Sequence, residues 1–203
     1  MQQIRTNGVV KIFNAAAANN LIKPWTIDNN EWTGSGFIIS DRIIVTNAHV
    51  AGQAKMMTIR KLVDGRRFPA KVIAMADQVD LAFITVDDEE FWSNALELEI
   101  SPDLVRFQDE VHVVGYPTPG DTVCITEGVV SRIDWDSYCQ SNDRNLCIQV
   151  LAYSCDDIFF ILIKYTRHGC VLSQLNHIFD RLMRPLMVVI VVDLVYLRAR
   201  FVG

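Results

Sequence analysis

The chain has 203 residues, 50% of them hydrophobic and 21% charged, which is the composition of a folded globular protein and excludes global disorder. This length suffices for one ordinary domain or for two small packed barrels. The formal net charge of -5 excludes the basic footprint of a nucleic-acid-binding protein.

The N-terminal residues contain no basic segment followed by an apolar one, so the sequence predicts no secretory signal. An Arg- and Ser-rich transit peptide is not expected either, because residues 9–13 already have the composition of a strand. A soluble intracellular protein is therefore expected rather than a secreted one.

From residue 8 to residue 134 the chain has the pattern of an all-β protein, because short β-branched or aromatic runs alternate with Gly, Pro, Asn and Asp. Turns are expected at residues 64–65, 117–120 and 141–143. Strands at this spacing predict a sandwich or a barrel. The predicted strands are Val9–Phe13, Gly36–Ser40, Arg42–Thr46, Met56–Arg60, Phe68–Met75, Leu81–Val86, Glu110–Val114, Val123–Ile133 and Leu146–Leu151.

Two residues in this region are candidates for catalysis. His49 follows the apolar run 43–46, where the chain leaves a predicted strand, and a lone histidine there is either structural or an acid-base group. Asp80 directly precedes the apolar strand 81–86, and a carboxylate there is either exposed or buried beside a cation such as an imidazolium. The pair is a more specific signal than either residue alone.

The sequence changes character after residue 150. Of the last 53 residues 33 are hydrophobic, and the regular turn signals stop. The apolar runs Ile158–Ile163 and Leu186–Leu197 are too short or too interrupted to cross a membrane, and each is either a buried strand or part of a buried helix. Residues 174–183 have the apolar spacing of a short amphipathic helix.

The five cysteines are odd in number and form no C-x-x-C pair. The sequence therefore predicts neither a zinc site nor a disulfide framework, and free thiols in a reducing compartment are expected. No metal and no other cofactor is expected.

Six segments form an ordered set: residues 33–39 (TGSGFII), 44–50 (IVTNAHV), 79–82 (VDLA), 88–92 (DEEFW), 113–117 (VVGYP) and 126–132 (TEGVVSR). In this order they resemble the protease Do (Deg/HtrA) family of trypsin-like serine peptidases, and its plant members most. The resemblance covers about residues 8–150. It implies a trypsin-like double β-barrel with the active site between the barrels. It also implies that His49 is the general base and that Asp80 is the carboxylate that orients it.

The resemblance ends where this family carries its nucleophile. After a strand similar to residues 146–150 the family continues into a Gly-Asn-Ser-Gly-Gly-Pro turn, whereas this chain reads Leu-Ala-Tyr-Ser-Cys-Asp-Asp over residues 151–157. Ser154 and Cys155 lie nearest to the expected place, but no glycine beside them can turn the backbone and aim N–H groups at an oxyanion. Asp156 and Asp157 would add negative charge there. No nucleophile is therefore predicted, and the chain is expected to be an inactive peptidase homologue.

The resemblance implies a complete first barrel over residues 8–105, a partial second barrel over 106–150 and a divergent apolar tail over 151–203. The tail comes either from a shifted reading frame or retained intron, or it is a diverged segment that still closes the second barrel. Three functions stay open: an inactive protease Do-like homologue, a non-catalytic module that binds unfolded chains or joins trimers of family members, and a degenerate gene product. The expected partners are polypeptides or family members, with no nucleic acid and no membrane span.

Overall fold

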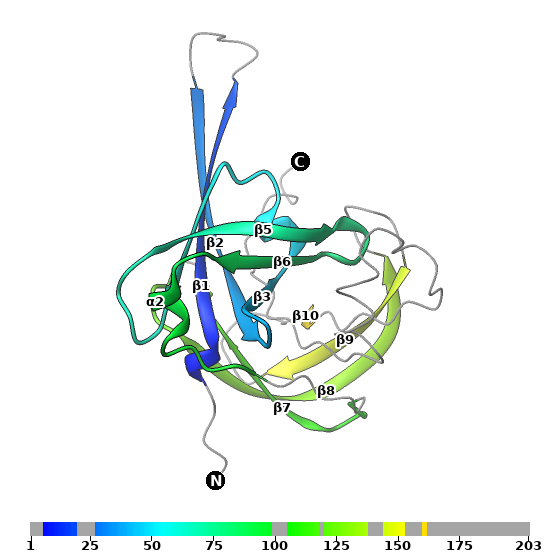
Figure 1. Cartoon of the computed structure of the whole chain (residues 1–203). Coiled ribbons are helices and arrows are strands. Elements are labelled where there is room, and N and C mark those ends of the chain that lie inside the picture. Colours follow the sequence, from blue (N-terminus) through cyan, green and yellow to red (C-terminus); the bar gives the residue numbers. More distant parts are fainter. Residues whose placement is uncertain are drawn as a thin grey trace.

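The structure is a computed structural model, and it describes residues 6–19, 27–98, 105–117, 120–137, 144–152 and 160–161. Figure 1 shows a barrel built from β1 to β6 and, beside it, a curved sheet that contains β7 to β10. The fold is all-β with a closed first barrel and a partial second one, as the sequence predicts.

The first barrel closes through six antiparallel strands in the order β1-β2-β3-β6-β5-β4. β1 closes it, because this strand pairs with β2 along one edge and with β4 along the other. Closure leaves the barrel without an open strand edge. Its strands are β1 (Val9–Asn19), β2 (Ile27–Ile39), β3 (Ile43–Thr46), β4 (Met56–Lys61), β5 (Phe68–Ala76) and β6 (Leu81–Val86).

The hairpin of β1 and β2 is longer than the sequence predicts, and in Figure 1 it extends well beyond the barrel. The added part contains residues 15–18, which are all alanine, and residues 28–31, which are acidic or Asn, and neither composition favours strands. The register is nevertheless continuous from Val9↔Phe37 to Asn19↔Ile27. The backbone ladder of the hairpin therefore overrides weak local propensity here.

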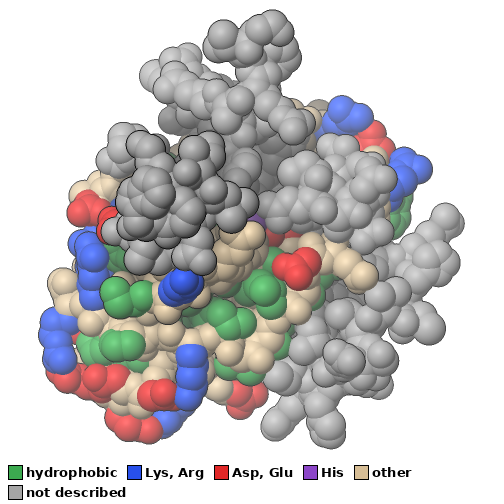
Figure 2. All heavy atoms as spheres, turned by 90° about the horizontal axis from the view of Figure 1, so that it is seen from above, with side chains coloured by type: hydrophobic (Ala, Val, Ile, Leu, Met, Phe, Trp, Pro, Cys, Tyr) green, Lys and Arg blue, Asp and Glu red, His purple; other side chains and the backbone are tan. Residues whose placement is uncertain are grey.

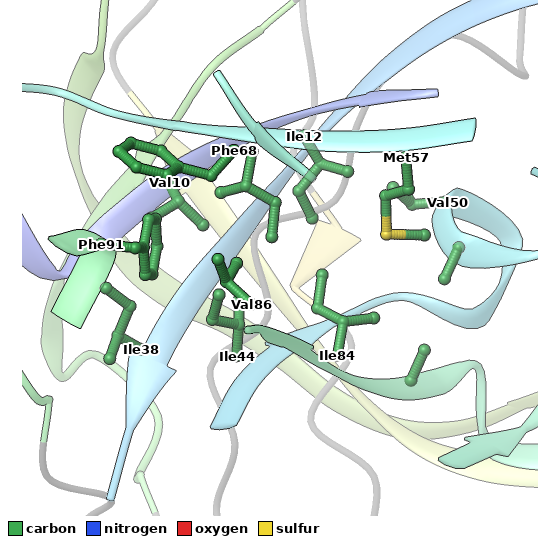
Figure 3. Packing of buried hydrophobic residues seen from close by; sticks show 13 residues of the cluster. Val10, Ile12, Ile38, Ile44, Val50, Met57, Phe68, Ile84, Val86 and Phe91 are labelled. Carbon is green, nitrogen blue, oxygen red and sulfur yellow. The ribbon is translucent and has the colours of Figure 1, made fainter. Parts of the chain in front are cut away.

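The barrel is filled by side chains from all six strands and from two short helices, as Figure 3 shows. Ile12, Ile44, Ile59 and Ile84 are completely buried. Burying an aliphatic side chain of this size stabilises a fold by about 1.5–3 kcal/mol. This cluster fills the barrel that carries His49 and Asp80.

The described residues also contain four short helical segments, of which the first precedes β1 and the other three lie between strands. They are η1 (Thr6–Gly8), α1 (Ala48–Ala51), η2 (Asp77–Val79) and α2 (Glu89–Trp92). The Asp88 side chain caps α2 by accepting from the N–H of Glu90, and Phe91 of α2 is buried in the barrel core. No helix in the described part of the chain has the length and apolarity of a membrane span.

The second sheet has four strands in the order β10-β9-β8-β7. They are β7 (Glu110–Gly115), β8 (Cys124–Ser137), β9 (Arg144–Ala152) and β10 (Phe160–Ile161). β10 lies within the apolar run 158–163, where the sequence left strand and helix open, and it pairs with β9 at Gln149 and Ile148. The predicted helix at residues 174–183 and the apolar run 186–197 lie outside the described residues.

The loop after β7 joins the sheet to the first barrel. Its Tyr116 N–H donates to the hydroxyl of Ser35 at 2.8 Å, and Lys11 donates to the carbonyl of Gly120 and to the carboxylate of Asp121. The hydrogen bond and charge of Lys11, together with the charge of Arg60, hold the pKa of Asp121 below its usual range. Burial raises the pKa of Tyr116.

The surface mixes charges of both signs. Figure 2 shows Lys and Arg side chains beside Asp and Glu on one face, with apolar side chains between them. Exposed ion pairs of this kind contribute about 0–1 kcal/mol each, so they are not what holds the barrel together. The described pairs include Arg42–Glu89, Arg66–Glu90 and Lys71–Asp87.

Candidate active site

His49 lies on α1, which follows β3 and contains only four residues. A single helical turn is not stable by itself in water, so its position must come from tertiary contacts. The carbonyl of Val50 accepts from Nδ2 of Asn14 at 2.7 Å and from Nε1 of Trp32 at 2.9 Å. The Val50 side chain is 1% exposed and belongs to the barrel core. Two strands of the barrel therefore fix the turn that carries His49.

Gly34 on β2 lets this turn approach the barrel wall closely. A Cβ atom at position 34 would lie 2.5 Å from Cγ1 and 2.8 Å from Cγ2 of Val50, well inside van der Waals contact. Only a residue without a side chain fits at this point. The glycine therefore helps to set the distance between α1 and β2.

Asp80 lies between η2 and β6 with its backbone in the left-handed region, at φ 51° and ψ 41°. Few residues other than glycine adopt this conformation, although aspartate does so more readily than most. β6 pairs with β3 from Thr46↔Ala82 onward, which brings Asp80 beside the start of α1. The strained residue is buried, with 3% of its surface exposed.

The structure brings His49 and Asp80 into direct contact. Nδ1 of His49 lies 2.8 Å from Oδ2 and 3.0 Å from Oδ1 of Asp80, and the backbone N–H of His49 donates to Oδ1 at 2.9 Å. Since an ionised carboxylate only accepts, Nδ1 carries the proton in the neutral imidazole. The other ring nitrogen, Nε2, then holds the free electron pair that a general base needs.

The side chains of the pair differ in exposure, at 19% for His49 and 4% for Asp80. The carboxylate is thus held inside while one edge of the imidazole reaches the surface. Among the residues that the structure describes, no side chain forms a hydrogen bond with Nε2. The geometry suits a base that acts on a group brought to Nε2 from outside the first barrel.

The serine and cysteine considered as nucleophiles, Ser154 and Cys155, lie outside the described residues. Ser35, which is flanked by glycines in the sequence, is a structural residue. Its hydroxyl accepts from the N–H of Tyr116, and its carbonyl accepts from the hydroxyl of Thr46 at 2.8 Å. Both contacts are buried and tie β2 to neighbouring segments.

Within the described ranges, no group of three or more His, Cys, Asp or Glu side chains is arranged to hold a metal ion. Of the cysteines whose surroundings are described, Cys124 is a partly buried free thiol.

Sequence reasoning missed the residues that support the pair. Asn14 and Trp32 contact α1 across 36 and 18 residues of sequence, so no local pattern reveals them. Asn47 is part of the segment that carries the family resemblance, but the sequence alone assigns no role to it. Its side-chain amide donates to Oδ2 of Asp80 at 3.1 Å. A polar residue of the type that caps helices, placed just before the histidine, was the available signal.

Comparison with known proteins gives a consistent result. Residues 34–156 match the family model described as "Trypsin-like peptidase domain". A mitochondrial protease Do-like protein of Arabidopsis thaliana is 41% identical over 147 residues, and "Protease Do-like 4, mitochondrial" of the same plant is 38% identical over 147 residues. Each match covers 72% of this chain, whereas the chain spans only 26% and 28% of the lengths of these relatives.

Solved structures show the same fold. The structure described as "HtrA-type protease AlgW with tripeptide" superposes with a TM-score of 0.58 at 17% sequence identity. The match covers 78% of this chain and 48% of that one. At this identity the comparison supports the double-barrel architecture alone.

Proposed function

The chain belongs to the trypsin-like peptidase family, within its protease Do-like (Deg/HtrA) branch, and on this premise we propose that it is a serine-endopeptidase homologue without peptidase turnover. Its first barrel keeps the general base and the carboxylate that orients this base. The segment after β9 lacks the nucleophile turn. The observation that carries the proposal is this combination of a well-formed pair of His49 and Asp80 with the sequence that follows Val150.

In the proposed role, His49 is the general base and Asp80 its orienting partner. The support is geometric, since Nδ1 lies 2.8 Å from the carboxylate and Nε2 is left with its electron pair. Asp80 would also stabilise the imidazolium formed when Nε2 takes a proton. A pair of this kind transfers a proton only if a hydroxyl or water is positioned at Nε2.

The nucleophile is the missing part. The residues after Val150 are Leu151, Ala152, Tyr153 and Ser154, without the glycines that give a nucleophile turn its backbone angles and its oxyanion N–H groups. Removing the nucleophile of a serine protease lowers turnover by about 10⁶-fold. The remaining base cannot compensate for a loss of this size.

The proposal is tested with a fluorescent casein substrate and with a fluorophosphonate, which labels activated serines covalently. Wild-type protein should cleave casein no faster than the His49→Ala variant and should take up no label. Cleavage that Ser154→Ala or Cys155→Ser abolishes, or a fluorophosphonate adduct on Ser154, would show an active nucleophile and refute the proposal. An active protease Do-like protein, assayed in parallel, is the positive control.

A second candidate function is a non-catalytic module that binds polypeptides or assembles with copies of itself or of family members. It is favoured by the exposed apolar side chains Val72, Ile73 and Met75 on β5, which are 42%, 42% and 39% exposed. The strand also carries an irregularity between Val72 and Ala74. An apolar strand surface of this kind is where a partner would bury area.

Light scattering after size-exclusion chromatography tests this second function. The wild-type protein should elute with a mass above that of the monomer, and Ile73→Asp should return it to the monomer mass. Val63→Asp is the matched control, because Val63 is 77% exposed but lies in the loop between β4 and β5. A monomer mass for all three proteins at every concentration would rule out self-assembly through this strand.

A further inference from the structure

Asn47 occupies the position before the first residue of α1, and it does not cap this helix. Asparagine is among the preferred residues there, because its side-chain oxygen accepts an N–H of the first helical turn. In this structure the side chain of Asn47 forms no capping hydrogen bond. Its amide points to Asp80 instead, with Nδ2 at 3.1 Å from Oδ2 and 3.4 Å from the backbone oxygen.

This arrangement gives up local stability. A side-chain cap stabilises the first turn of a helix, and the oxygen that would supply it, Oδ1 of Asn47, is buried without a hydrogen-bond partner in the described structure. The orientation of the amide is fixed by its surroundings. With the amide turned over, Oδ1 would face the carboxylate of Asp80, and two acceptors would repel each other. The side chain of Asn47 is therefore used for Asp80 rather than for its own helix.

Asp80 needs such support. Its backbone is in the left-handed region, and its carboxylate is almost completely buried. The amide of Asn47 holds both the backbone oxygen and one carboxylate oxygen of this residue, while His49 contributes its backbone N–H and Nδ1. Donors around a carboxylate favour its ionised form and restrict its rotation.

We propose that Asn47 is a positioning residue for the pair formed by His49 and Asp80. Its amide keeps the carboxylate turned so that both oxygens face Nδ1 of the imidazole. The imidazole then carries its proton on Nδ1 and keeps the electron pair of Nε2 free. This inference rests on the proposed role of the pair, but it concerns the state of the imidazole and needs no turnover.

The test is ¹⁵N NMR of the full chain labelled at histidine, which distinguishes a protonated ring nitrogen from one with a free pair. Wild-type His49 in its neutral form should show a free pair at Nε2. In Asn47→Ala the fraction of this tautomer should fall at least twofold. Asn47→Asp keeps the size of the side chain but sets a second carboxylate against Oδ2 of Asp80, so it should lose the tautomer at least as strongly. His112, which pairs with Glu127 on the second sheet, is the internal control, and its ¹⁵N signals should not change.

Two results would overturn the inference. One is that both variants remain folded by circular dichroism and keep the wild-type tautomer. The other is that Asn47→Asp keeps it while Asn47→Ala loses it, since this pattern indicates that only the volume of the side chain matters. If neither variant folds, the wild-type protein still decides the question. The side-chain NH₂ signal of Asn47 should shift when acid protonates His49, and a signal that stays fixed would contradict the contact through Asp80. A positive casein assay would refute the proposed function without changing any of these outcomes.

Discussion

Replacing Gly34 by alanine tests how closely α1 is packed against the barrel. The new methyl group would lie 2.5 Å from Cγ1 and 2.8 Å from Cγ2 of Val50, where ordinary contacts are about 3.5–4 Å. Val50 cannot give way easily, because its side chain is 1% exposed and its carbonyl is held by Asn14 and Trp32. We therefore expect α1 to be pushed away from β2.

The size of the effect follows from two opposing terms. Overpacking a core costs about 1–3 kcal/mol. Replacing glycine by alanine stabilises by about 0.4–1 kcal/mol through the unfolded chain, and the backbone at Gly34 allows this because its φ is not positive. The free energy of unfolding should fall by about 1–2 kcal/mol. For a chain of this size the melting temperature should fall by about 2–8 °C.

Urea unfolding and thermal melts of four variants measure this effect. Gly65→Ala is the control, because a Cβ at position 65 meets nothing within 4 Å, and it should leave stability unchanged or slightly higher. Val50→Ala should cost about 2 kcal/mol by itself. The double variant Gly34→Ala with Val50→Ala should cost at least 1 kcal/mol less than the sum of the two. Additive costs, or a Gly34→Ala variant as stable as wild type, would refute the packing argument.

Three further predictions concern buried and charged groups. Asp80→Asn should lower the free energy of unfolding by about 1–3 kcal/mol, because the amide group of the new asparagine leaves a buried donor without an acceptor. Urea unfolding measures this, and an unchanged urea midpoint would contradict it. The hydrogen bond from Lys11 lowers the pKa of Asp121 in the folded protein. The ionised carboxylate therefore stabilises the fold above the pKa of Asp121 in the unfolded chain, which is near 4, and this stabilisation is lost as the pH falls through the lower pKa of the folded state. Urea midpoints of Asp121→Asn should therefore lie below those of wild type at pH 6 and converge with them in acid, and parallel curves would contradict the ion pair. Burial raises the pKa of Tyr116, so its ionisation opposes folding above about pH 10, and wild type should lose more stability than Tyr116→Phe as the pH rises from 9 to 11.

The strands that the sequence predicts well are those whose side chains alternate or are uniformly buried. β6 begins at Leu81 and ends at Val86 as predicted, because its six residues are apolar or β-branched and it lies in the barrel wall. The long arm of β1 and β2 was not predictable in this way. Its alanines on β1 and its acidic residues on β2 are held in strands by the backbone hydrogen bonds between the two strands. Such pairing does not depend on the side chains, so the composition does not reveal it.

The candidate site likewise contains residues that the sequence identifies and contacts that only the structure shows. The segments around His49 and Asp80 identify both residues, since the order of the motifs is specific. The sequence predicts that a strand ends before His49 but not that α1 follows, because four residues are too few to show helical periodicity. Asn14 and Trp32 hold this helix through its backbone carbonyl, and a contact to a carbonyl depends on the fold rather than on the residue that offers it. The supporting contacts are therefore visible only in three dimensions.

His49 and Asp80 both lie in the first barrel. His49 follows β3, Asp80 precedes β6, and these two strands are neighbours in the barrel wall. Asn47 and His49 donate to the carboxylate, and β1 and β2 contribute contacts that hold α1. In the proposed function, the segment after β9 has lost the nucleophile, while the contacts of His49 with Asp80 and those of α1 with β1 and β2 are kept. On this proposal the chain keeps a well-oriented imidazole, whereas its sequence over residues 151–157 contains none of the glycines of a nucleophile turn.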